Sequence, residues 1–151
     1  MVDVKMTVDA SRERVFEVLA DGWTYAAWVV GASHIRDVDA GWPARGTRIH
    51  HCVGSWPLLL DDVTKVHVAD PPRLLELDAR AWPFGTARIR LELRETAPGT
   101  TEILMSEQAT RGPGRLLPEA AQALFLVPRN RESLRRLADL AKGREAAQPP
   151  A

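Results

Sequence analysis

The amino-acid sequence predicts an α+β domain in which a curved antiparallel sheet of seven strands wraps around one long C-terminal helix. Two observations carry this prediction: most of the chain divides into short apolar segments joined by turn residues, and a helical period of apolar residues returns only near the C-terminus. The chain has 151 residues, the length of one ordinary domain. We therefore expect a single domain over residues 1–143.

The N-terminal part predicts one strand and two short helices. Apolar and polar residues alternate from Val2 to Val8, as in a strand with one buried face. From Asp9 the apolar residues fall on one helical stripe, which ends at Gly22. A second short helix is predicted from Trp23 to Val30, because its apolar residues recur three or four positions apart.

Six further strands follow, and tight loops join them. They are predicted at Ser33 to Val38, Thr47 to Val53, Leu59 to Ala69, Leu74 to Arg80, Thr86 to Arg94 and Thr101 to Ala109. The loops contain glycine and proline and are too short for a crossover helix, so neighbouring strands are expected to be antiparallel. The long helix is predicted from Pro118 to Ala141, and residues 144–151 are expected to form a flexible, polar tail.

Composition excludes several classes of function. Lys and Arg number 20 and so do Asp and Glu, which argues against a nucleic-acid-binding face. The single cysteine, Cys52, excludes an internal disulfide framework and a thiolate-only zinc site. Adjacent residues of a strand point to opposite faces, so only His50 and Cys52 could chelate a metal together, and we predict neither a metal nor a cofactor. The N-terminus lacks the apolar core of a signal peptide, and no apolar run is long enough to span a bilayer, so we expect a cytoplasmic protein without integral membrane association.

One end of the predicted sheet gathers aromatic residues beside prolines. Successive loops of a meander alternate between the two ends of the sheet, which places at one end the loops that contain Trp28, Trp56, Trp82 to Phe84, and Arg115 to Leu117. We interpret this end as the entrance to a binding site, because apolar rims on globular domains usually mark binding sites. The alternative is that the tryptophans cap the core.

Three polar residues lie on the inward face of the predicted sheet. Pairing the strands around Trp56 sets His51 opposite Asp62 within hydrogen-bonding reach, and Glu107 falls opposite Ile89. Such a His and Asp pair could act as a general base, or it could be a structural hydrogen bond. On the long helix, Arg131 shares the apolar stripe and either reaches toward Glu107 or an acidic ligand group, or extends to solvent.

The order of elements, together with several sequence stretches, resembles a known superfamily. The stretches are VDASRERVFEVLAD, GWPARGTRIHHCVG, DDVTKVHVADPPRLLELDAR, SEQATRGPGRLLPEA and RNRESLRRLADLA. They resemble the helix-grip proteins of the START and Bet v 1 superfamily, specifically its polyketide cyclase/dehydrase and lipid-transport type. The resemblance implies a deep apolar cavity between the sheet and the long helix. The candidate ligand contacts there are Trp28, Trp56, Leu77, Trp82, Phe84, Ile89, Leu91, Met105, Leu117, Leu124, Pro128 and Arg131.

Three functions remain open from the sequence. The leading hypothesis is a noncatalytic or weakly catalytic binder of a lipid, polyketide or aromatic small molecule. The second is an enzyme of the cyclase, aromatase or dehydratase type, in which His51 with Asp62, or Glu107, moves protons. The third is a protein-interaction domain, for which a second copy of the chain is a candidate partner. Pro128 inside the long helix also predicts a kink over the cavity.

Overall fold

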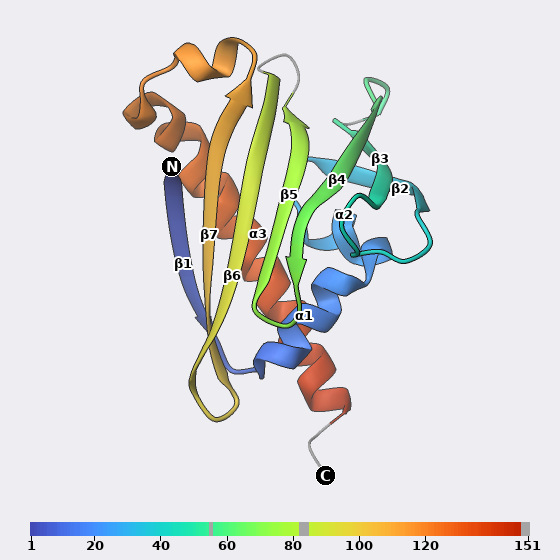
Figure 1. Cartoon of the computed structure of the whole chain (residues 1–151), viewed down its shortest axis with the longest axis vertical. Helices are drawn as coiled ribbons and strands as arrows, with labels where there is room; N and C mark the ends of the chain where they lie inside the picture. The colour runs from blue at the N-terminus through green and yellow to red at the C-terminus, as the bar shows by residue number, and fades with distance from the viewer. Residues whose placement is uncertain (55, 82–84, 149–151) are drawn as a thin grey trace.

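The computed structural model describes residues 1–54, 56–81 and 85–148, and it confirms the predicted fold class (Figure 1). The chain runs through β1 (Val2–Val8), α1 (Arg12–Ala20), the short 3-10 helix η1 (Gly22–Thr24), α2 (Tyr25–Trp28), β2 (Ala32–Val38), β3 (Arg48–Val53), β4 (Leu60–Asp70), β5 (Leu74–Ala81), β6 (Gly85–Ala97), β7 (Thr100–Arg111), η2 (Pro113–Leu116) and α3 (Glu119–Ala147). All neighbouring strands are antiparallel, in the order β1-β7-β6-β5-β4-β3-β2.

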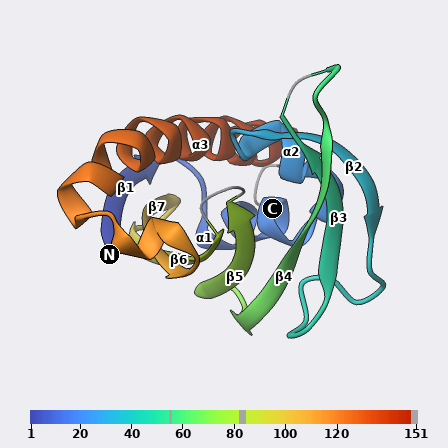
Figure 2. The same cartoon turned by 90° about the horizontal axis from the view of Figure 1, so that it is seen from above.

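The sheet is strongly curved around α3. Figure 2 shows the strands as an arc, with α3 lying across its open side and α1 and α2 inside the arc. The alternation read from the sequence places one face of each central strand toward the helices, and Leu75, Leu77, Leu91 and Ile103 are almost completely buried there. Leu134 and Leu137 of α3 complete this core.

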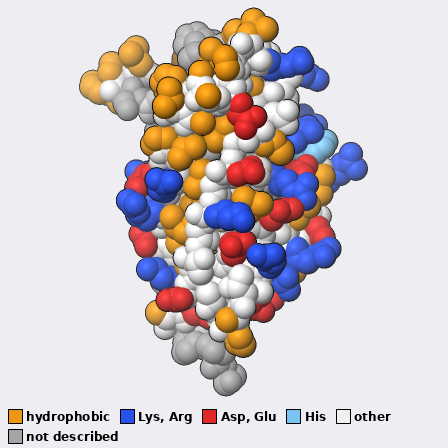
Figure 3. Space-filling model, turned by 90° about the vertical axis from the view of Figure 1, so that its left-hand side faces the viewer, with side chains coloured by type: hydrophobic (Ala, Val, Ile, Leu, Met, Phe, Trp, Pro, Cys, Tyr) orange, Lys and Arg blue, Asp and Glu red, His pale blue; other side chains and the backbone are white. Residues whose placement is uncertain are grey.

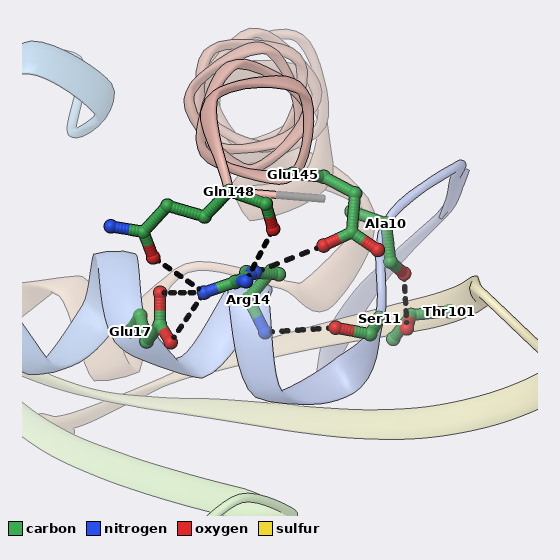
Figure 4. Close-up of polar contacts among 7 residues, drawn as sticks. All are labelled: Ala10, Ser11, Arg14, Glu17, Thr101, Glu145 and Gln148. Atoms are coloured by element: carbon green, nitrogen blue, oxygen red, sulfur yellow. Dashed lines mark hydrogen bonds and ion pairs between the residues drawn. The ribbon is translucent and has the colours of Figure 1, made fainter. Parts of the chain in front are cut away.

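The C-terminal end of α3 is tied to α1 by a polar cluster around Arg14 (Figure 4). Arg14 Nε donates to Glu145 Oε2 at 3.0 Å, and its terminal nitrogens bind Glu17 and Gln148. A second ion pair joins Arg144 to Asp21 at 2.8 Å. These contacts hold the last turns of the helix, which continues to Ala147 and so ends later than the predicted Ala141.

The other differences from the predicted elements are small. Strands β6 and β7 extend further than expected, because they form a long hairpin around Gly99. The helix predicted from Trp23 to Val30 is shorter and divided, with one 3-10 turn followed by one α-helical turn. Across the described parts of the chain, no helix combines the length and apolar character needed to cross a membrane.

Candidate functional site

Of the cavities in the described part of the chain, two lie between the sheet and the helices and share Ala87 in their walls, and a third, more polar one lies between β1, β7 and the start of α3. The first has a volume of about 360 Å³ and the second about 270 Å³. The first is lined by residues of α2, of the segment after it, and of strands β3 to β7, including Tyr25, Val29, Val53, Ala79, Ile89 and His51. The second lies between β6, β7 and the first turns of α3, and its wall includes Ala109, Leu117, Phe125 and Leu126. Of the predicted ligand contacts, Ile89 lines the first cavity and Leu117 the second.

An ion pair divides the two cavities. Glu107 on β7 and Arg129 on α3 form a salt bridge through Glu107 Oε2, and both residues, together with Ala87, line both cavities. Glu107 is 2% exposed, and the same oxygen accepts a hydrogen bond from Asn130 Nδ2 at 2.8 Å. Glu107 also lies opposite Ile89, as the sequence predicted.

Of the two alternatives for Arg131, the structure shows the extension to solvent and not the contact with Glu107. Arg131 is exposed, and Arg129 takes the predicted place. Two residues along an α-helix correspond to about 200° of rotation, so these side chains lie on nearly opposite faces. Sequence reasoning missed Arg129 because it is not on the stripe of apolar residues, whereas the structure turns the neighbouring polar residue, Asn130, into the core.

His51 belongs to a buried chain of hydrogen bonds at the wall of the first cavity. Its Nε2 lies 2.9 Å from Thr64 Oγ1, which in turn lies 3.0 Å from the hydroxyl oxygen of Tyr25. Burial raises the pKa of Tyr25 to about 12. Burial also lowers the pKa of His51, against the opposing effect of the Asp62 carboxylate. The other ring nitrogen of His51, Nδ1, is buried and has no hydrogen-bond partner among the residues that the structure describes.

The predicted pairing of His51 with Asp62 is correct in register but wrong in its hydrogen bond. The two residues are opposite each other on β3 and β4. The imidazole nevertheless bonds to Thr64, which lies diagonally across the strand pair, while Asp62 Oδ1 accepts from the backbone N–H of Val63 at 2.7 Å and lies 3.8 Å from Arg80 Nε. Asp62 is therefore a buried charge near His51, and it is not among the residues that line either cavity.

The residues adjacent to His51 make other contacts. His50 Nε2 lies 2.9 Å from Asp39 Oδ1, and the Cys52 thiol donates to Asp61 at 3.4 Å. Burial raises the pKa of Cys52, which disfavours the reactive thiolate. Within residues 1–54, 56–81 and 85–148, no three His, Cys, Asp or Glu side chains are grouped so that they could hold a metal ion.

Exposed apolar side chains surround the end of the molecule near both cavities. They belong to the β3–β4 connection and to the segment from η2 into α3: Trp56, Leu58, Leu59, Leu60, Leu116, Leu117, Leu124 and Phe125. We call these eight residues the apolar rim. Figure 3 shows hydrophobic side chains gathered toward the end that carries η2 and the start of α3. Trp56 is 84% exposed. Leu58 and Leu60 line the first cavity, and Leu117 and Phe125 line the second.

Several predicted ligand contacts lie elsewhere. Trp28 is 2% exposed and packs edge-on against Tyr25 in the core, so for this residue the core alternative is correct. Leu77, Leu91 and Met105 are also core residues. Leu124, Pro128 and Arg131 are on the exposed surface of α3, although Leu134 and Leu137 further along the helix are buried in the core. Trp82 and Phe84 lie outside the described residues.

The model of the family described as "Polyketide cyclase / dehydrase and lipid transport" matches residues 1–142. The chain belongs to this family. No curated protein is similar enough in sequence to count as a match.

Solved structures share the fold of this polyketide cyclase/dehydrase and lipid-transport domain. The Zhui aromatase/cyclase from Streptomyces sp. R1128 is 17% identical over 98% of this chain and 95% of its own, with a TM-score of 0.69. The di-domain ARO/CYC StfQ from the steffimycin biosynthetic pathway is 15% identical over 97% of this chain and 46% of its own, with a TM-score of 0.67. Ara h 8.0201 is 14% identical over 97% of each chain, with a TM-score of 0.66. At these identities the likeness establishes the fold only.

Proposed function

We propose that this domain binds an apolar small molecule of lipid, polyketide or aromatic type between its sheet and α3. The observation that carries the proposal is the pair of cavities on the inner side of the sheet, at the end where the apolar rim is exposed. Pockets for small molecules are typically concave and mainly apolar, with a few polar groups that orient the ligand. Membership of a family named for polyketide and lipid chemistry supports the same class of ligand.

Two measurements test this proposal. Native mass spectrometry of the protein purified from its own host should show a copurifying apolar ligand, and the neutral dye N-phenylnaphthylamine should bind the emptied protein with increased fluorescence. Dye binding that persists unchanged when Ala87, which lines both cavities, is replaced by leucine would overturn the assignment to this site. The control is Ala141→Leu, a core position on α3 outside the lining of both cavities.

A cyclase-like enzyme is the second candidate. It is favoured by the position of His51 and Glu107 in the wall of the same cavity, where a polyketide chain would be folded and protonated or deprotonated. Two proteins of similar structure are the Zhui aromatase/cyclase and the di-domain ARO/CYC StfQ. On this hypothesis, His51→Ala abolishes turnover of a polyketide-like substrate while dye binding and melting temperature change little. Parallel losses of turnover, dye binding and stability would indicate a structural role instead.

A further inference from the structure

The buried chain of hydroxyl groups beside His51 has a preferred direction. Tyr25, Thr64 and His51 are linked in a row, and among the described residues Thr64 Oγ1 is the only hydrogen-bond partner of the Tyr25 hydroxyl and of the His51 ring. If the Tyr25 hydroxyl donates to Thr64 and Thr64 donates to Nε2, each hydroxyl hydrogen has an acceptor. The reverse direction leaves two buried groups without a partner among the described residues, the Tyr25 hydrogen and the Nδ1 lone pair, whereas this direction leaves only the Nδ1 hydrogen. The hydrogen bonds therefore run from the Tyr25 hydroxyl through Thr64 to His51.

The direction of these hydrogen bonds determines which ring nitrogen of His51 carries the proton. With Nε2 accepting from Thr64, the proton of a neutral ring is on Nδ1. The ring is neutral near pH 7 because burial, together with the nearby Arg36 and His50, lowers its pKa, although Asp62 and the Cys52 backbone act in the opposite sense. Nδ1 is the nitrogen that is buried without a partner among the described residues. His51, which lines the first cavity, thus carries a buried hydrogen-bond donor for which the described residues supply no acceptor.

The second cavity has a different character. Apart from the shared Glu107 and Arg129, the described side chains of its wall are mostly small or apolar, with Leu117, Phe125 and Leu126 as the largest hydrophobic ones. The two charged groups between the cavities, Glu107 and Arg129, already pair with each other, and Glu107 also accepts a hydrogen bond from Asn130. In the first cavity, Arg80 faces Asp62. Both arginines, Arg129 and Arg80, thus face a carboxylate. The site therefore favours an uncharged ligand.

We propose that the two cavities are the two halves of one site for an uncharged molecule that has a carbonyl-type oxygen at one end and a hydrocarbon part at the other. The oxygen accepts a hydrogen bond from His51 Nδ1, after a small rotation of the ring toward the cavity, and the hydrocarbon part lies against Phe125. Arg129, whose side chain is 34% exposed, moves aside for the ligand while Asn130 continues to hold Glu107. This inference rests on the proposed function and names its ligand class.

The direction of the chain can be tested without any ligand. In ¹⁵N NMR of protein labelled at histidine, the shifts of the two ring nitrogens report which of them carries the proton. We expect a protonated Nδ1 and an unprotonated Nε2 in His51 at pH 7, and a loss of this preference in Thr64→Val. A proton on Nε2 in the unchanged protein would overturn the donor assignment.

The ligand class can be tested with a matched pair of fluorescent probes. The probes are the naphthyl ketone prodan and its analogue with a methylene group in place of the carbonyl. His51→Gln keeps a polar group near the position of Nε2 but removes the donor at Nδ1, whereas His51→Asn keeps a donor near Nδ1. We expect His51→Gln to weaken binding of the ketone about fivefold, the value of one ordinary hydrogen bond, and to leave the methylene analogue unchanged. His51→Asn should bind the ketone more tightly than His51→Gln does.

A third variant locates the hydrocarbon part. Ala109→Leu narrows the second cavity at a position remote from the hydroxyl chain, and it should weaken both probes equally. If His51→Gln changes both probes alike, or neither, the donor role of His51 is wrong while binding in the cavity stands. If neither probe binds the unchanged protein, the proposed function itself fails.

Discussion

Replacing Ala87 with leucine tests whether the space between the sheet and α3 is hollow. Ala87 is 6% exposed, lies on β6 and lines both cavities. Leucine adds three carbon atoms, and burying each is worth about 0.8 kcal/mol, so complete burial in empty space would raise the free energy of unfolding by about 2 kcal/mol. The cavities open to solvent, and we therefore expect a gain between zero and about 2 kcal/mol, with loss of dye binding.

The matched substitution in a packed region should have the opposite sign. Ala141 on α3 is fully buried in the core, and inserting the same three carbon atoms there is expected to lower the free energy of unfolding by about 1–3 kcal/mol. Urea unfolding with linear extrapolation measures both variants. If Ala87→Leu is destabilised as strongly as Ala141→Leu, the space beside Ala87 is filled and the reasoning fails.

Three further predictions concern the ion pair of Glu107 and Arg129, the buried Tyr25 and the apolar rim. Arg129→Ala should lower the free energy of unfolding in urea by about 3 kcal/mol, because it leaves the buried Glu107 carboxylate without its cation, whereas Glu107→Ala should cost less, because the Arg129 side chain already reaches solvent; a larger loss in Glu107→Ala than in Arg129→Ala would contradict the geometry. Tyr25, the single tyrosine, should ionise at about 12 in the folded state against an ordinary value of 10.0, so its contribution to stability is intact below pH 10 and is lost as the pH rises toward 12; an absorbance titration with a midpoint near 10 would refute its burial. Phe125→Ser should weaken dye binding and Leu124→Ser should not, because both side chains are exposed but only Phe125 lines a cavity.

The register of the sheet could be predicted from the sequence, and with it the position of two site residues. The period of two in a strand fixes which side chains share a face, so His51 fell opposite Asp62 and Glu107 opposite Ile89 as expected. The hydrogen bond of His51 could not be predicted. His51 bonds to Thr64 and not to Asp62 because of the side-chain rotamers and the buried Tyr25. Tyr25 belongs to a helix, and the alternation of residues in the strands does not predict where that helix packs.

The inward face of α3 could be predicted in the C-terminal half of the helix, where Leu134, Leu137 and Ala141 are buried, but not in its N-terminal half. The prediction followed apolar residues such as Leu124, but the helix turns Asn130 and Ser133 inward and leaves Leu124 in solvent. Two polar residues occupy the buried face because they have partners there: Asn130 binds Glu107, and Ser133 accepts a hydrogen bond from the backbone of Val30. A stripe of hydrophobic residues identifies the packed face only where packing is apolar.

The most direct test of ligand binding between sheet and helix is an NMR measurement of nuclear Overhauser effects between bound prodan and the methyl groups of the protein. Binding in the cavities predicts contacts from the probe to the methyl groups of Ala87 and Ile89, which lie on the inner wall of the sheet. Contacts restricted to Leu116, an exposed rim residue outside the lining of both cavities, would contradict the account.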